Sequence, residues 1–205
     1  MIRGDSSEYN LLEKWSKDFD CQGHYSCEIG VREGNGSKII IDNVINNYFH
    51  IGVDPYGDIT YKHFDNDENY HWTDFDGNIL YNSDGSFKRP TYPDSMRDQM
   101  IKDFEDYTKR GKYHFVNKTD IDFMNDDSYK RMIFSFVCFD GPHTTKDVLR
   151  EAIWFADRSA KHTRFVFDDH EHYRMDIISH VLSYWDFKTI ESSTNKILLE
   201  KNGWY

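Results

Sequence analysis

The sequence predicts an α/β protein whose doubly wound, mostly parallel sheet has seven strands. Three observations predict this fold class. Short apolar runs alternate with segments whose apolar residues recur at helical spacing, as in successive β-α-β units. Residues 131–139 are apolar almost throughout, as in a central parallel strand that is covered on both faces. Two short final runs, 187–190 and 196–200, predict a C-terminal antiparallel hairpin.

The first β-α-β unit contains a glycine-rich turn. We expect a strand over 25–31, a helix over 38–45 and a second strand over 48–53. Gly30 and Gly34 lie in the turn, where glycine permits a positive φ and the close approach of a ligand. Asp54 comes directly after the second strand, at a position suited to binding a ribose diol. This corner of the sheet therefore predicts a ligand that contains a nucleoside.

Two classes of ligand use such a corner. A dinucleotide fingerprint requires G-x-G-x-x-G, but the third position, counted from Gly34, is Ile39. The segment from Glu28 to Gly34 instead reads E-x-G-x-x-x-G, and a carboxylate at Glu28 suits a cationic ligand better than a pyrophosphate. This pattern resembles the first motif of class I S-adenosylmethionine (SAM)-dependent methyltransferases. A structural glycine turn in another α/β protein is the alternative.

The second half of the chain continues the alternation. The expected elements are a helix over 96–110, strands over 113–116 and 131–139, a helix over 148–156, a strand over 163–167 and a helix over 177–185. Polar residues follow the strand 113–116, and Thr119 among them is placed to contact an adenine ring.

Two further segments flank or interrupt this core. Residues 55–94 are rich in Tyr, Trp and Phe and are too long for an ordinary loop, so we expect an inserted, β-rich aromatic cap over the ligand. A packed subdomain that only stabilises an edge is the alternative. Residues 1–24 are expected to form a leader with a short amphipathic helix, packed on the core or in a dimer contact. The SAM-binding domain then covers residues 25–205.

Composition limits the partners of this chain. It has 205 residues and a net charge of −11, which opposes binding to a phosphate backbone because no basic surplus releases counterions. No apolar run reaches the length of a transmembrane helix, and no signal peptide pattern is present. The three cysteines, Cys21, Cys27 and Cys138, are read as reduced thiols. We therefore expect a cytoplasmic protein with a small-molecule substrate, no nucleic acid and no membrane partner; a homo-oligomer is compatible with the sequence.

Acidic side chains gather at the predicted carboxyl ends of the strands, where ligands of open α/β sheets bind. They are Glu28, Asp54, Asp140, Asp168 and Asp169. So many carboxylates on one rim are costly to ionise without a counter-charge. A divalent cation such as Mg²⁺ supplies one, and Asp140, Asp168 and Asp169 are the candidate ligands. The alternative is that Asp168 and Asp169 only cap the following helix.

The spacing Asp140-Gly141-x-His143, together with Asp168-Asp169, resembles the metal-dependent O-methyltransferases that act on sugar hydroxyls of macrolide and aminocoumarin antibiotics. That resemblance implies a Rossmann-like methyltransferase fold. It implies that Mg²⁺ is bound by the three aspartates named above and that Asp140 also faces the cofactor. The SAM-binding positions that it implies are Glu28, Gly30, Gly34, Ser37 and Asp54.

One position departs from that family pattern. The antibiotic-sugar enzymes read D-G-D-H, and their second Asp is taken as the general base, whereas this chain has Pro142 there. The base must then be His143, His170 or a metal-bound hydroxide, and a histidine has an ordinary pKa of about 6.5 that suits the task.

These observations predict a SAM-dependent O-methyltransferase, assisted by Mg²⁺, that acts on a hydroxyl of a small sugar or polyol. The alternative is a non-catalytic module of the same fold that binds SAM or a nucleotide-sugar, which Pro142 favours. An NAD-dependent enzyme is a third hypothesis, and Glu28 weakens it.

Overall fold

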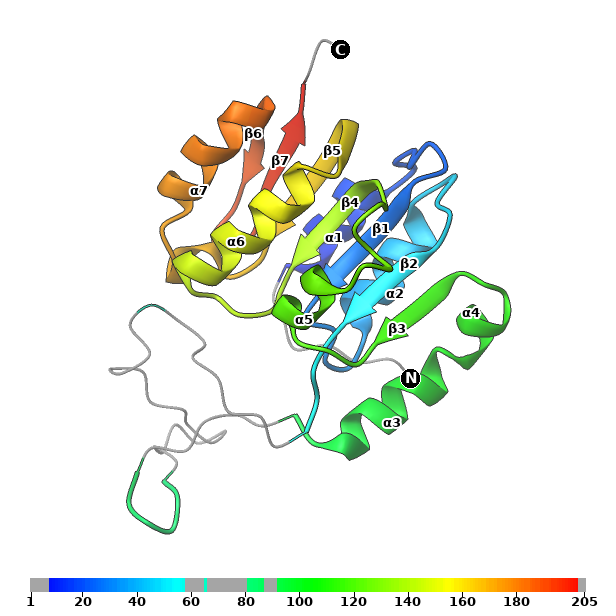
Figure 1. Cartoon of the computed structure of the whole chain (residues 1–205), viewed down its shortest axis with the longest axis vertical. Coiled ribbons are helices and arrows are strands. Elements are labelled where there is room, and N and C mark those ends of the chain that lie inside the picture. The colour runs from blue at the N-terminus through cyan, green and yellow to red at the C-terminus, as the bar shows by residue number, and fades with distance from the viewer. Residues whose placement is uncertain (1–7, 58–64, 66–80, 87–91, 203–205) are drawn as a thin grey trace.

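The computed structural model describes residues 8–57, 65, 81–86 and 92–202, and most of the expected aromatic insert, 55–94, lies outside them. The described residues contain a seven-stranded sheet in the order β3-β2-β1-β4-β5-β7-β6. The strands are β1 (Tyr25–Ile29), β2 (His50–Val53), β3 (Tyr113–Val116), β4 (Phe134–Phe139), β5 (Ser159–Phe167), β6 (Phe187–Ser192) and β7 (Ile197–Lys201). β1 to β5 are parallel, and β7 is antiparallel to both β5 and β6. The predicted fold class, including the C-terminal hairpin, is confirmed (Figure 1).

Helices cover both faces of the sheet (Figure 1). They are α1 (Tyr9–Ser16), α2 (Asn35–Asn43), α3 (Asp94–Asp103), α4 (Glu105–Lys109), α5 (Asp120–Asn125), α6 (Thr145–Ala156) and α7 (Met175–Leu182). One core packs α5, α6 and α7 on the sheet through residues such as Phe123, Phe155 and Ile178. A second core packs α1 and α2 on the other face, where Trp15 and Ile40 are buried. The helices on each face of the sheet therefore bury apolar side chains against it.

Several element boundaries differ from the expected ones. β1 ends at Ile29 rather than at residue 31, because Gly30 turns the chain with a φ of +87°. α2 ends at Asn43, and Ile45, the last residue of the expected helix, lies outside it and is 44% exposed. The single helix expected over 96–110 is two helices, because the chain breaks at the fully buried Phe104. Helix α5 was not predicted.

The N-terminal helix packs on the sheet. Leu12 and Trp15 of α1 are buried in the second core beside β4 and β7 residues. Lys14 at its exposed face forms an ion pair with Glu191 of β6 at 2.7 Å. Glu8, just before the helix, accepts hydrogen bonds from the turn that joins β6 to β7. The N-terminal segment therefore holds the C-terminal hairpin.

Two further observations concern the cysteines and the length of the helices. Cys21, Cys27 and Cys138 are free and buried. Among the helices of the described ranges, none has both the length and the apolar character needed to cross a membrane.

Candidate functional site

The loop between β1 and α2 lies directly against the end of β4. Gly30 and Gly34 take φ values of +87° and +90°, as their glycine identity permits. A Cβ on Gly30 would lie 2.0 Å from the carbonyl oxygen of Asp140, closer than any side chain tolerates. The Asp140 N–H in turn donates to the Ile29 carbonyl oxygen at 2.8 Å. Gly30 is therefore the residue that brings the first loop and Asp140 together.

Asp54 fixes the shape of the same loop. Its Oδ2 accepts hydrogen bonds from the backbone N–H groups of Val31 and Arg32, both at 2.9 Å. Its Oδ1 accepts one from the N–H of Tyr56 at 3.1 Å. Burial raises the pKa of this carboxyl, and the backbone hydrogen bonds oppose that rise. Since a carboxylate oxygen has two lone pairs, Oδ1 retains capacity for a ribose hydroxyl.

Glu28 and Ser37 lie behind the loop rather than in a cavity wall. Glu28 is 1% exposed, and the Ser37 hydroxyl donates to its Oε2 at 2.5 Å. The same hydroxyl contacts Nε2 of the buried His50 at 3.0 Å. Burial raises the pKa of Glu28 to about 8 and lowers the pKa of His50 to about 3, so both side chains are largely neutral near pH 7. In this structure the two predicted cofactor-binding residues support the glycine loop from beneath.

A cavity of about 250 Å³ opens at the carboxyl ends of β1 to β4. Its lining brings together three predicted cofactor-binding residues, Gly30, Asp54 and Thr119, from the ends of three strands. Ile29, Val53, Gly141 and Pro142 supply apolar and backbone surface. This mixture of apolar walls with a few polar groups is typical of a small-molecule site.

The far side of the cavity carries charged residues that the sequence analysis did not identify as site residues. Arg150 of α6 pairs with Asp120 at 2.6 Å and with Asp147 at 3.0 Å, and all three line the cavity. Thr119 caps α5, since its hydroxyl accepts from the N–H of Asp122 at 3.1 Å. The sequence signal for this helix start was present as Thr-x-x-Asp, a capping pattern.

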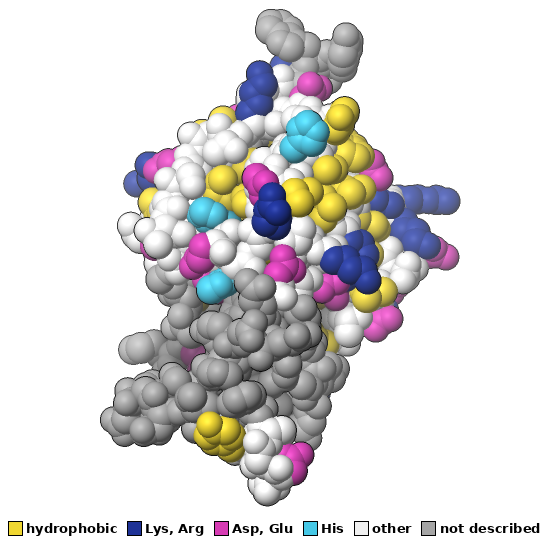
Figure 2. All heavy atoms as spheres, turned by 90° about the vertical axis from the view of Figure 1, so that its left-hand side faces the viewer, with side chains coloured by type: hydrophobic (Ala, Val, Ile, Leu, Met, Phe, Trp, Pro, Cys, Tyr) yellow, Lys and Arg dark blue, Asp and Glu magenta, His cyan; other side chains and the backbone are white. Residues whose placement is uncertain are grey.

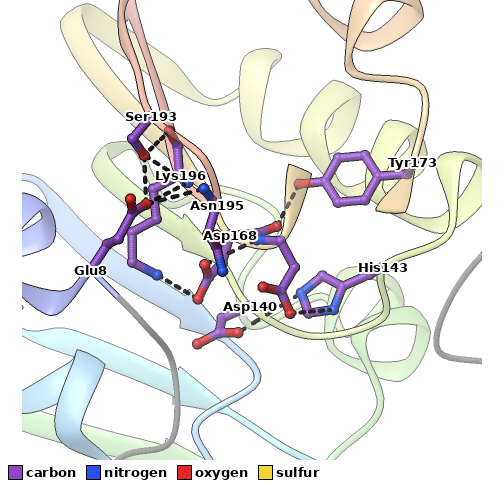
Figure 3. A network of polar contacts seen from close by, with 9 residues as sticks. Glu8, Asp140, His143, Asp168, Tyr173, Ser193, Asn195 and Lys196 are labelled. Atoms are coloured by element: carbon purple, nitrogen blue, oxygen red, sulfur yellow. Dashed lines mark hydrogen bonds and ion pairs between the residues drawn. The ribbon is translucent and has the colours of Figure 1, made fainter. Parts of the chain in front are cut away.

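A histidine lies between two carboxylates beside this cavity (Figure 3). His143 Nε2 is 3.8 Å from Asp140 Oδ1, and its Nδ1 is 3.7 Å from Asp169 Oδ2. Burial lowers the pKa of His143 to about 4, although the nearby Asp168 opposes the shift. The ring lies almost parallel to that of Tyr173, at an interplanar angle of 9°. The imidazole is therefore neutral near pH 7 and held in a fixed orientation.

A buried lysine supplies positive charge to this cluster, and the sequence analysis missed it. Lys196 Nζ is 2.5 Å from Asp168 Oδ2, and both side chains are 1% exposed (Figure 3). Oδ1 of Asp168 accepts the N–H of Asp169 at 2.9 Å, so both carboxylate oxygens are engaged. Burial alone would lower the pKa of Lys196, but Asp168 and Asp140 outweigh it and the net shift is upward.

The expected Mg²⁺ site finds no support in this arrangement. A divalent cation bound by Asp140, Asp168 and Asp169 would have to share Asp168 with an ammonium group at 2.5 Å. Within the described ranges, no three His, Cys, Asp or Glu side chains are arranged to hold a metal ion. The residues present therefore do not fit the metal that the resemblance implied.

His170 lies close to the cluster in sequence but contacts a different part of the structure. Its ring Nε2 is 3.0 Å from the carbonyl oxygen of Ser193, and its backbone N–H donates to the carbonyl of Asn195 at 3.1 Å. These contacts join the end of β5 to the β6–β7 turn. The catalytic role of His170 stays a prediction. In this structure the residue links two segments of the backbone.

Among the comparisons with known proteins, only the one with solved structures found matches, and it bears on the fold. No protein-family model matches the sequence, and no curated protein matches it. The structure resembles an O-methyltransferase from Bacillus cereus in complex with SAH, at 9% identity over 98% of this chain and 84% of that chain, with a TM-score of 0.57. It also resembles an rRNA methylase from Streptococcus thermophilus, at 10% identity over 95% of this chain and 94% of that chain, with a TM-score of 0.53. A third similar structure is a 16S rRNA methyltransferase of T. thermophilus in complex with AdoMet and guanosine, at 10% identity over 98% of this chain and 44% of that chain, with a TM-score of 0.55. The chain therefore has the Rossmann-like methyltransferase fold.

Proposed function

We propose that this chain is a SAM-dependent methyltransferase that methylates a hydroxyl group of a small sugar- or polyol-type substrate. One observation carries the proposal. The cavity lined by Gly30, Asp54 and Thr119 adjoins, through the contact of Gly30 with Asp140, a buried histidine flanked by carboxylates. The cavity suits an adenosine, and the acidic rim suits a cationic sulfur beside it.

Similar structures support the choice of cofactor. The Bacillus cereus O-methyltransferase was solved with SAH and the T. thermophilus enzyme with AdoMet. Some of the similar structures are rRNA methylases, so RNA is the competing substrate class. We favour a small molecule because the net charge of −11 opposes a polyanion. On the face shown in Figure 2, Lys and Arg are interspersed with Asp and Glu rather than gathered in a basic stripe.

The residues of the site perform three tasks in this proposal. When bound, SAM supplies an electrophilic methyl group on a positively charged sulfur. Asp54, which fixes the loop, would hold the adenosine part, and Asp140, against which the loop packs, would face the sulfonium charge. The methyl group would pass to the substrate oxygen, and the electron pair of the broken carbon–sulfur bond would remain on sulfur. His143 takes the proton from the substrate oxygen.

The low pKa of His143 is compatible with that last task. A hydroxyl oxygen that is gaining a methyl group becomes strongly acidic, so a base with a pKa of about 4 can accept its proton. Asp140 and Asp169 lie on either side of the ring. Burial raises the pKa of both carboxyls, and each would stabilise the imidazolium in its ionised form.

Binding and turnover measurements test the proposal separately. Calorimetry should show one molecule of SAM or SAH bound per chain. Labelled SAM incubated with a panel of sugars and polyols should give methylated product. His143→Asn should lower kcat by roughly 100-fold with little change in the SAM Kd, whereas His180→Asn, at an exposed histidine of α7, should change neither. An unaltered kcat in H143N would remove His143 from the mechanism, and methylation of RNA alone would replace the substrate class.

The second candidate is a non-catalytic module that binds SAM. Two observations favour it. Pro142, which lines the cavity, stands where the antibiotic-sugar O-methyltransferases have an acidic residue, and His143 is a weak base. This candidate predicts tight binding of SAM and SAH with no product from any polyol in the panel.

A further inference from the structure

We propose that the ammonium group of Lys196 takes the place of a divalent cation in this site, so that the protein binds its ligands without a metal. The inference rests on the proposed function. It is tested by metal binding and thermal unfolding rather than by turnover, so the inference and the proposed function can fail independently. The ammonium lies 2.5 Å from Asp168 Oδ2, at a position where both partners are 1% exposed. A buried carboxylate cluster needs one cation, and the chain provides it from the residue just before its last strand.

The strand pairing places this lysine at the site by construction. β7 runs antiparallel to β5, and Phe167 lies opposite Ile197 in the register. The residue after Phe167 and the residue before Ile197 therefore meet at the same edge of the sheet. These are Asp168 and Lys196.

The turn that carries Lys196 is anchored from the N-terminal segment (Figure 3). Glu8 Oε2 accepts the Ser193 hydroxyl at 2.6 Å and the N–H groups of Asn195 and Lys196 at 3.1 and 3.2 Å. The ring of Tyr9 lies 5.7 Å from the Lys196 ammonium. A lysine held at its backbone and covered by an aromatic ring is a fixed component of the site.

An internal cation changes what the site can do with a substrate. A divalent ion could chelate two neighbouring hydroxyls, whereas the ammonium is buried and already bonded to Asp168. The rim left for the substrate is His143 with Asp140 and Asp169. The site therefore needs only one hydroxyl on its substrate, and Lys196 acts as a positioning residue for the carboxylates.

Mn²⁺ binding and thermal unfolding of the full chain test this inference. The wild type should bind no Mn²⁺ in electron paramagnetic resonance titrations, and EDTA should change neither its Tm nor its SAM Kd. Lys196→Met keeps the apolar stem but removes the charge, so its Tm should fall by about 10 °C. The freed carboxylates should then bind Mn²⁺ at least about tenfold more tightly than in the wild type, and Mn²⁺ should restore part of the lost Tm. Lys188→Met, at an exposed lysine of β6, is the matched control and should show none of these effects.

A double variant separates charge from packing. In K196M/D168N both partners of the buried pair are neutral, so Tm should return toward the wild-type value without a gain in Mn²⁺ affinity. Stoichiometric Mn²⁺ binding by the wild type would overturn the inference, and this measurement remains decisive if K196M does not fold. A folded K196M with unchanged Tm and no Mn²⁺ binding would overturn it as well.

Discussion

The buried carboxyl of Glu28 should make the stability of this protein depend on pH in the opposite sense to an ordinary ion-paired acid. Glu28 is 1% exposed and its nearest polar partner is the Ser37 hydroxyl at 2.5 Å. A Cβ on Gly36 would lie 1.9 Å from its Oε1, so the carboxyl is tightly enclosed by the start of α2. Burial therefore favours the neutral form of this acid.

The magnitude follows from the two pKa values of the group. Burial raises the pKa of Glu28 from 4.5 to about 8 in the folded state. Between these values the folded protein holds a proton that the unfolded chain has lost, so the folded state binds more protons and stability falls as pH rises. The slope is up to about 1.4 kcal/mol per pH unit, and the whole window amounts to a loss on the order of 5 kcal/mol.

Urea unfolding followed by tryptophan fluorescence, from about pH 5 to about pH 8, measures this slope directly. Glu28→Gln mimics the protonated form, so its free energy of unfolding should match the wild type near the acid end and exceed it increasingly as pH rises. Glu13→Gln, at an exposed glutamate of α1, should leave the wild-type slope in place. Parallel stability curves for the wild type and E28Q would refute the reasoning, because no proton would then be retained at Glu28.

Three further perturbations test the loops around the site. Gly30→Ala should lower stability by about 2–4 kcal/mol and abolish SAM binding, because its Cβ would lie 2.0 Å from a backbone oxygen; Gly23→Ala shares a positive φ but meets no atom within 4 Å, so chemical denaturation of the pair isolates the clash. Asp54→Asn should weaken SAM binding at least about tenfold by calorimetry. Both oxygens of the carboxylate accept hydrogen bonds, from three backbone N–H groups in all, whereas an amide has only one accepting oxygen. An unchanged Kd would mean that the loop keeps its shape without the charge. Glu8→Ala should speed hydrogen exchange of the two turn amides that donate to it by about tenfold, and unchanged protection would show that the turn holds itself.

Much of the fold could be predicted because the central strands are covered on both faces. Residues 134–139 are all buried, and only Ser135 among them is polar, so the strand is visible in the sequence as an almost continuous apolar run. The hairpin was equally visible, since two short β-prone runs joined by a polar turn have few other solutions. These features depend on local sequence, which is why a single sequence was enough.

Tertiary contacts decided the features that were missed. Ile101 lies within the single helix expected over 96–110 and is 46% exposed, while Phe104 turns inward and packs on Tyr113 with ring centroids 4.4 Å apart. That contact ends α3 and starts α4, and no spacing rule within the segment contains it. Helix α5 was missed for a different reason, because its polar first turn was assigned to ligand contact at a strand end.

The sequence predicted that several of the candidate residues would gather at one edge of the sheet, but it did not reveal their counter-charge. Strand-end reasoning placed Gly30, Asp54 and Thr119 at one edge, and all three line the same cavity. The acidic rim was also expected to need a counter-charge, and a metal was predicted because only residues that follow parallel strands were expected at that edge. An antiparallel strand brings its beginning, not its end, to the ligand edge. The residue just before β7 should therefore be counted with the residues just after β4 and β5, and in this chain that rule selects Lys196 beside Asp168.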